Sequence, residues 1–115
     1  LPLTTRNFIN QYFSKPQISY IKIDSEFLSK KYEVTLTDRT EIDFDKKGNW
    51  TEVDCKKGAV PAALIPVSIK DYVKKNFPNE IITKIERKGT GIEVELANDF
   101  SLKFNKKGQF VSMDD

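Results

Sequence analysis

An internal duplication constrains the fold of this 115-residue chain more than any other feature of its sequence. When residue 1 is placed over residue 65, segment 6–9 (RNFI) aligns with 70–73 (KDYV) at an offset of 64. Further along, the offset falls to 60, and segment 44–50 (FDKKGNW) aligns with 104–110 (FNKKGQF). The lysine pair, the glycine and the flanking aromatic residues recur in the same order, so chance similarity between two amphipathic segments is a poor explanation.

The change of offset places four extra residues in the first copy, between Ile21 and Tyr32. A single copy of about 55 residues buries too little surface to be secure alone. We therefore predict one domain made of a first α-β repeat (residues 1–54), a connector (55–64) and a second α-β repeat (65–115).

Each repeat begins with an apolar stripe at helical spacing. The stripe of the second repeat ends where Pro78 cannot donate to the helical ladder. Ser68, with Asp71 three residues later, predicts a capping pair at the start of that helix. The stripe residues of the two repeats are Phe8, Ile9, Tyr12 and Phe13, and Ile69, Tyr72, Val73 and Phe77.

Alternating apolar and polar residues follow each helix and predict strands with one buried face. They form segments 32–36 and 40–44 in the first repeat and 92–96 and 100–104 in the second. The dipeptides Asp38-Arg39 and Asn98-Asp99 predict tight hairpins, because Asp and Asn tolerate left-handed backbone.

The two Lys-Lys-Gly segments predict three-residue hairpin loops in which Gly48 and Gly108 supply a positive φ. This register places Phe44 opposite Trp50 and Phe104 opposite Phe110, with both pairs under the helices. The predicted fold class is α+β: a tandem duplication of a helix plus a four-stranded antiparallel meander, with the helices on one face of a curved antiparallel sheet.

Composition removes several classes of function. The chain has no His and one Cys, which excludes His-based catalysis, an intramolecular disulfide and a Cys-cluster zinc site. A net charge of +2 does not predict a nucleic-acid partner. No apolar run reaches the roughly 20 residues that span a bilayer, so membrane insertion is not expected.

Three features carry a family resemblance: the helix that ends at Phe77-Pro78, the strands Tyr32–Leu36 and Ile92–Leu96, and the loops in segments 44–50 and 104–110. Together they resemble the PepSY-like repeat over essentially the whole chain. That family comprises periplasmic proteins common in Bacteroides and is similar in fold to beta-lactamase-inhibitor protein. One departure is that Asp38-Arg39 and Asn98-Asp99 stand where the family often has Asn-Gly. The resemblance implies export to the periplasm, a signal peptide missing from this sequence, and a non-enzymatic binding, inhibitory or regulatory role.

The outward strand positions supply the candidate binding residues. If Ile21 faces the helices, Tyr20 faces outward, and exposed aromatic side chains in a polar surround are typical binding anchors. Phe27, in the longer part of the first repeat, is a second exposed aromatic candidate, and local packing is the alternative for both. The predicted surface for a protein or peptide partner consists of Tyr20, Glu33, Thr35, Glu93 and Glu95.

The same pattern leaves a second function open. Outward carboxylates are solvated, which argues against acid–base catalysis, so we expect no enzyme and no catalytic residues. Hard cations prefer carboxylate oxygens, which makes a calcium- or small-ligand-responsive envelope sensor the alternative. No cofactor is otherwise predicted, and Cys55 is expected to be an incidental thiol. The loose calcium candidates are Asp38 with Asp43 and Asp45, and the pair Asp114-Asp115.

Overall fold

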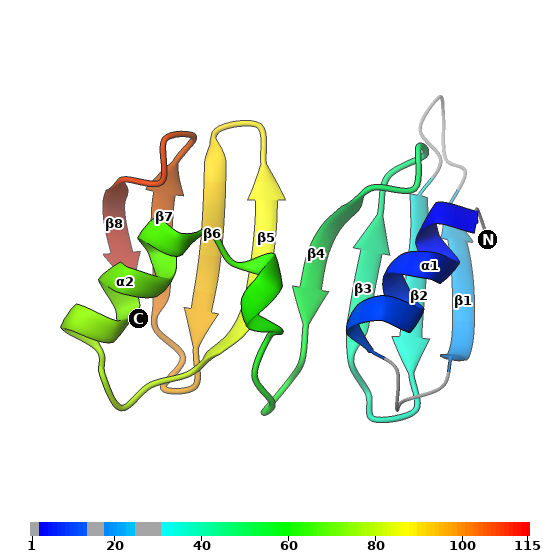
Figure 1. Cartoon of the computed structure of the whole chain (residues 1–115), viewed down its shortest axis with the longest axis horizontal. Coiled ribbons are helices and arrows are strands. Elements are labelled where there is room, and N and C mark those ends of the chain that lie inside the picture. Colours follow the sequence, from blue (N-terminus) through cyan, green and yellow to red (C-terminus); the bar gives the residue numbers. More distant parts are fainter. Residues whose placement is uncertain (1–2, 14–17, 25–30) are drawn as a thin grey trace. The chain divides into compact units, whose positions relative to one another are not determined.

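The chain divides into two compact units, Leu1–Val53 (the first unit) and Asp54–Asp115 (the second unit), shown in Figure 1. The computed structural model describes residues 3–13, 18–24 and 31–115. Its described residues form two α-helices and eight strands, with each helix preceding four strands. The predicted α+β fold class is confirmed.

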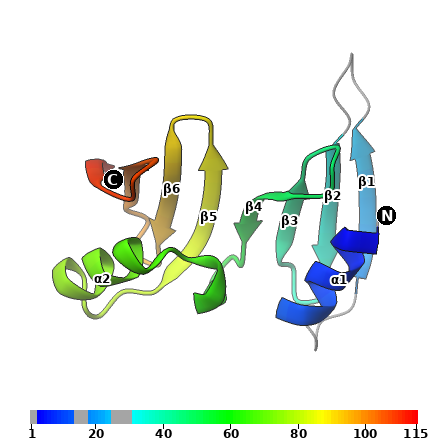
Figure 2. The same cartoon turned by 45° about the horizontal axis from the view of Figure 1, so that its top comes forward.

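The strands of the first unit are ordered β1-β2-β3-β4, and antiparallel pairing joins β1 to β2 and β2 to β3. The helix α1 lies across one face of these strands (Figure 1, Figure 2). The elements of the first unit are α1 (Leu3–Tyr12), β1 (Ile18–Asp24), β2 (Lys31–Leu36), β3 (Glu41–Phe44) and β4 (Trp50–Asp54).

The second unit repeats this arrangement with strand order β5-β6-β7-β8, and α2 lies across one face of its strands (Figure 2). A one-turn 3-10 helix, η1, precedes α2 within the predicted connector. The elements of the second unit are η1 (Ala62–Leu64), α2 (Val67–Asn76), β5 (Ile82–Lys88), β6 (Gly91–Leu96), β7 (Ser101–Asn105) and β8 (Phe110–Asp114).

The two units share the register of their first strand pair. In the first unit Ile18 pairs with Leu36, and the register shifts between Ile18 and Tyr20. In the second unit Ile82 pairs with Leu96, and the register shifts between Ile82 and Lys84. Ile82 lies 64 residues after Ile18, and Leu96 lies 60 after Leu36, so the structural offsets equal those of the sequence alignment.

The cores follow the predicted alternation. In the first unit Val34, Ile42 and Val53 of the strands and Ile9 of α1 are almost completely buried. The aromatic ring of Phe8 contacts Phe44 with centroids 5.7 Å apart and Trp50 with centroids 6.4 Å apart. The Phe8 side chain of α1 therefore contacts both Phe44 and Trp50. This confirms the prediction that the aromatic pair of the first unit lies under its helix.

The aromatic cluster of the second unit has the same design. Tyr72 of α2 stacks on Phe110 with ring centroids 4.7 Å apart and meets Phe104 edge-on at 5.5 Å. Phe104 and Phe110 are direct partners in the β7–β8 register, as predicted. Such offset and edge-on arrangements add about 1 kcal/mol per pair beyond the buried area.

The Lys-Lys-Gly loops also form as predicted. Gly48 has φ +87° and its amide donates to the Asp45 carbonyl at 3.0 Å, while Gly108 has φ +79° and its amide donates to Asn105 at 2.9 Å. The side chain of Asp45 further accepts hydrogen bonds from the amides of Lys47 and Asn49. Glycine suits the left-handed position because it has no Cβ.

Two local predictions need correction. The β2–β3 hairpin has a three-residue loop, in which Arg39 adopts φ +77° and the Asp38 carboxylate accepts the Thr40 amide at 3.0 Å. The helix α2 is capped at Pro66, whose φ of −55° already suits a helix start, and no side chain caps it. Ser68 lies inside the helix instead, close to the loop at Gly108.

Candidate functional site

The outer face of the first unit, opposite α1, brings three of the predicted binding residues together. Tyr20 on β1 is the direct strand partner of Thr35 on β2, and Lys22 is the partner of Glu33. Because side chains alternate between the faces of a strand, these residues point away from the buried core. Tyr20 is 61% exposed, which leaves most of its ring available for contact.

A hollow of about 240 Å³ lies on this outer face. Register places Asp43 beside Glu33 and Glu41 beside Thr35, so β3 closes one side of the hollow and β1 the other. We call it the acidic hollow, because three carboxylates and one ammonium group line it. Its lining residues are Tyr20, Lys22, Glu33, Val34, Thr35, Glu41 and Asp43.

The lining of the acidic hollow holds more negative than positive side chains. The Lys22 ammonium lies 3.9 Å from a Glu33 carboxylate oxygen, and both side chains are substantially exposed. An ion pair in this setting contributes little to stability, typically below about 1 kcal/mol. With three carboxylates against one ammonium, the lining carries a net charge of −2, which favours cationic ligands.

The remaining predicted residues, Glu93 and Glu95, lie on the outer face of the second unit. Glu93 is half-buried, with Glu86 and Lys103 as its strand partners and the Lys88 ammonium bonded to its carboxylate at 3.0 Å. Lys88 also lies 3.8 Å from the Glu86 carboxylate. The charges around Glu93 therefore balance locally.

Sequence reasoning placed Glu41 and Asp43 on a solvated face and did not single out Lys22, although all three line the acidic hollow. The alternation that identified Glu33 and Thr35 also marks these positions as outward. The alternation does not give the pairing register of the strands. That register determines which outward residues become neighbours. Phe27 lies outside the described residues.

The predicted calcium ligands are not assembled. Asp38 and Asp45 accept amides of their own turns, and Asp114 lies 3.8 Å from the Lys103 ammonium. Within residues 3–13, 18–24 and 31–115, no three Asp, Glu, Cys or His side chains gather as a metal site would require.

Comparison with protein families and solved structures gives consistent matches. A family model described as "Putative beta-lactamase-inhibitor-like, PepSY-like" matches residues 30–112. The chain is similar to a "putative calcium-regulated periplasmic protein" of Bacteroides thetaiotaomicron, with 43% identity and a TM-score of 0.96 over 100% of this chain and 91% of that one. No curated protein sequence matches the chain.

Two periplasmic proteins of Bacteroides vulgatus are also similar, each 38% identical to the chain. Their structures superpose with TM-scores of 0.96 and 0.94 over all of this chain, covering 92% and 91% of theirs, and the first is described as being of unknown function. These matches confirm the predicted family resemblance and the periplasmic location. Neither helix of the described residues has the length and apolar character needed to cross a bilayer.

Proposed function

The chain belongs to the PepSY-like family, and we propose that it is a non-enzymatic periplasmic domain that binds a protein or peptide through the open outer face of its sheet. The observation that carries the proposal is the acidic hollow, where Tyr20, Glu33 and Thr35 adjoin on neighbouring strands. The inhibitor-like description of the family model supports a protein partner.

The chemistry of the hollow favours a basic, extended segment of that partner. A Lys or Arg side chain entering it meets the carboxylates of Glu33 and Asp43, while the exposed Tyr20 ring can cover the aliphatic stem or stack on a guanidinium. Thr35 offers a hydroxyl for a further hydrogen bond. In an extended segment alternate side chains point to one side, so residues two apart can enter together.

The absence of a catalytic role is supported by the chemistry of the same residues. The sequence has no His, and the carboxylates of the hollow are half-buried or exposed in a polar setting. General acid catalysis needs a desolvated carboxyl group, which this arrangement does not provide. The descriptions of the similar proteins name no enzyme.

A peptide titration tests the proposal. We expect an extended peptide of alternating Lys and Thr to shift the NMR resonances of Tyr20, Val34 and Thr35, and its Glu-Thr counterpart to leave them unchanged. The double variant Glu33→Gln, Asp43→Asn should weaken binding of the Lys-Thr peptide about two- to thirtyfold, because each charge at this partly exposed site contributes roughly 0.2–1 kcal/mol.

The pair Glu93→Gln, Glu95→Gln removes the same charge from the outer face of the second unit and serves as the control. Equal weakening by both pairs would mean that only net charge matters and would refute binding at the acidic hollow. Shifts that map to the helix side of the first unit would refute it as well.

A calcium-responsive sensor is the second candidate, and the description of the Bacteroides thetaiotaomicron relative as calcium-regulated is what favours it. Binding to the folded chain raises the melting temperature by mass action. A rise in the presence of millimolar calcium, and not of magnesium, would support this candidate. An unchanged melting temperature would leave peptide binding as the sole proposal.

A further inference from the structure

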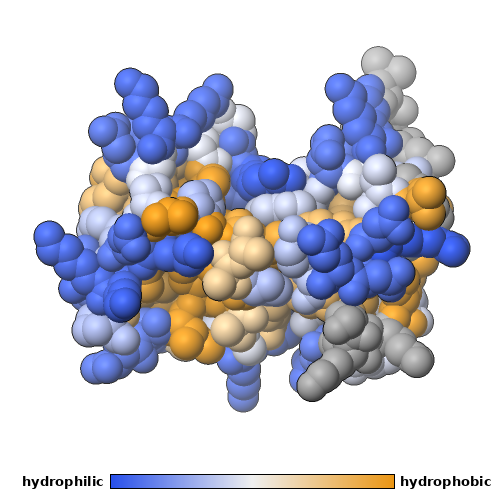
Figure 3. Space-filling model, viewed as in Figure 1, coloured by the Kyte–Doolittle hydropathy of each residue, from blue (hydrophilic) through white to orange (hydrophobic). Residues whose placement is uncertain are grey.

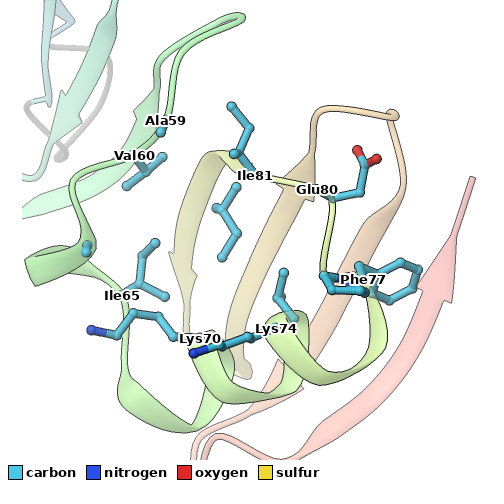
Figure 4. Close-up of a pocket in the computed structure, with 12 residues that line it drawn as sticks. Ala59, Val60, Ile65, Lys70, Lys74, Phe77, Glu80 and Ile81 are labelled. Carbon is cyan, nitrogen blue, oxygen red and sulfur yellow. The ribbon is translucent and has the colours of Figure 1, made fainter.

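An apolar groove of about 250 Å³ lies in the second unit, between α2, the connector and the start of β5 (Figure 4). It lies within the second unit and shares no residue with the acidic hollow of the first. Space-filling views show apolar surface around η1 and beside α2 (Figure 3). The groove therefore combines a concave shape with apolar atoms that reach the surface.

The walls of the groove are fixed by the backbone. The amide of Val60 donates to the carbonyl of Ile82 at 2.9 Å, which ties the connector to the edge of β5. The connector then turns through η1 and Pro66 into α2, so that Ile65 and Val73 form the opposite wall. Both of these side chains are more than nine-tenths buried, so the shape exists before any ligand arrives.

Most of the groove's surface is apolar. Apart from three charged residues, every lining side chain is Ala, Val, Ile, Phe or Pro. Ile81 remains 44% exposed, and Ala62 contributes a small side chain to the lining. An apolar ligand would remove this surface from water, whereas a peptide backbone would find few polar side chains to replace its bonds to water.

The charged residues make the two ends of the groove differ in charge. Lys70 and Lys74 are four residues apart on α2 and so lie on the same face of the helix. Figure 4 shows both ammonium groups on one side of the groove and the Glu80 carboxylate at the opposite end. Neither lysine forms an ion pair with any residue that the structure describes.

From this charge complementarity we propose that the groove binds a fatty carboxylate. The alkyl chain lies against Val60, Ile65 and Ile81, and the carboxylate lies between the ammonium groups of Lys70 and Lys74. The Glu80 carboxylate repels an anion at the far end, which fixes the orientation of the ligand. This site is independent of peptide binding at the acidic hollow.

Titration with sodium decanoate below its micelle-forming concentration tests the proposal, with methyl NMR of Ile65, Val73 and Ile81 as the readout. We expect these methyl resonances to shift together and saturate. Octanoate should bind about tenfold more weakly, because each methylene removed from water contributes a factor of about three to four. Decyltrimethylammonium, which has the same chain and the opposite charge, should bind more weakly than decanoate.

The double variant Lys70→Gln, Lys74→Gln should weaken binding of decanoate about two- to thirtyfold, since each of these half-buried or exposed charges contributes modestly. Lys75→Gln is the matched control, because Lys75 is exposed on the same helix and does not line the groove. Its affinity for decanoate should equal that of the unchanged chain. Circular dichroism verifies that each variant is folded.

Three results would overturn the proposal: no saturable methyl shift with decanoate, equal or tighter binding of decyltrimethylammonium, or decanoate shifts confined to residues outside the groove. A loss of binding free energy for Lys75→Gln that reached half the loss for the double variant would also overturn it, because net charge rather than position would then decide. Peptide binding at the acidic hollow could still hold in each of these cases, since the two sites share no residue.

Discussion

Gly91 is the position where one added methyl group should cost the most stability. It begins β6 with φ +148°, a conformation that residues with a Cβ rarely adopt. A Cβ built on Gly91 would lie 2.0 Å from the carbonyl oxygen of Phe104 and 2.9 Å from backbone atoms of Asn105. Because the clash is with backbone of the paired strand β7, no side-chain rotation can relieve it.

The magnitude of the Gly91→Ala effect follows from two terms. The unfavourable φ costs about 1–3 kcal/mol. Relief of the clash must separate β6 from β7 near Asn105, which weakens ladder hydrogen bonds worth about 1 kcal/mol each. A total of about 2–4 kcal/mol should lower the melting temperature by roughly 10–25 °C for a unit of this size.

Gly89→Ala in the same hairpin is the matched control. No atom lies within 4 Å of a Cβ at Gly89, and its φ is not positive. The substitution should leave stability unchanged or raise it by up to about 1 kcal/mol through the unfolded state. Thermal and urea unfolding followed by circular dichroism measure both variants. If Gly91→Ala melted within about 3 °C of the unchanged chain, the steric argument would be wrong.

Three further predictions concern the second unit and the Lys-Lys-Gly loop of the first unit. Tyr72→Ala should destabilise the second unit by about 2–4 kcal/mol in urea unfolding, because its ring stacks on Phe110 with centroids 4.7 Å apart. Asp45→Ala should cost about 1–2 kcal/mol by the same assay, because its carboxylate accepts two loop amides at 2.9 and 3.0 Å. Lys88→Gln should cost less than about 1 kcal/mol despite the 3.0 Å contact with Glu93, because both side chains are partly exposed. A larger loss for Lys88→Gln than for Asp45→Ala would contradict this ranking.

The parts of the fold that sequence predicted are those that local patterns determine. Alternation identified the buried faces around Val34 and Val94, and the Lys-Lys-Gly segments identified the loops at Gly48 and Gly108. In each case the chemistry of a few adjacent residues limits the backbone. The division into repeats at 1–54 and 65–115 stays a prediction, although the equal registers of the two strand pairs are what it requires.

The parts that sequence missed depend on contacts between distant residues or on competing local choices. Both Ser68 and Pro66 suit a helix start, and in the structure Pro66 is the residue that caps α2. The acidic hollow needs the register that places Asp43 beside Glu33, and the apolar groove needs the hydrogen bond from Val60 to Ile82. No spacing within one segment encodes such a neighbour.

Comparison between the repeats separates residues that maintain the fold from those available for function. At aligned inward positions the character persists, as with Phe44 and Phe104. At several aligned outward positions it changes, although Glu33 and Glu93 are both carboxylates.

The aromatic Tyr20 corresponds to Lys84, and the carboxylate of Asp43 corresponds to the ammonium of Lys103. Packing requirements act on both repeats alike and therefore do not account for a reversal of charge on the outer face. Ligand recognition can account for it, because the acidic hollow belongs to the first unit, whereas the charges around Glu93 balance locally. This divergence supports peptide binding by the first unit, and it predicts that exchanging Asp43 and Lys103 would remove binding of the Lys-Thr peptide from the first unit without altering the melting temperature by more than a few degrees.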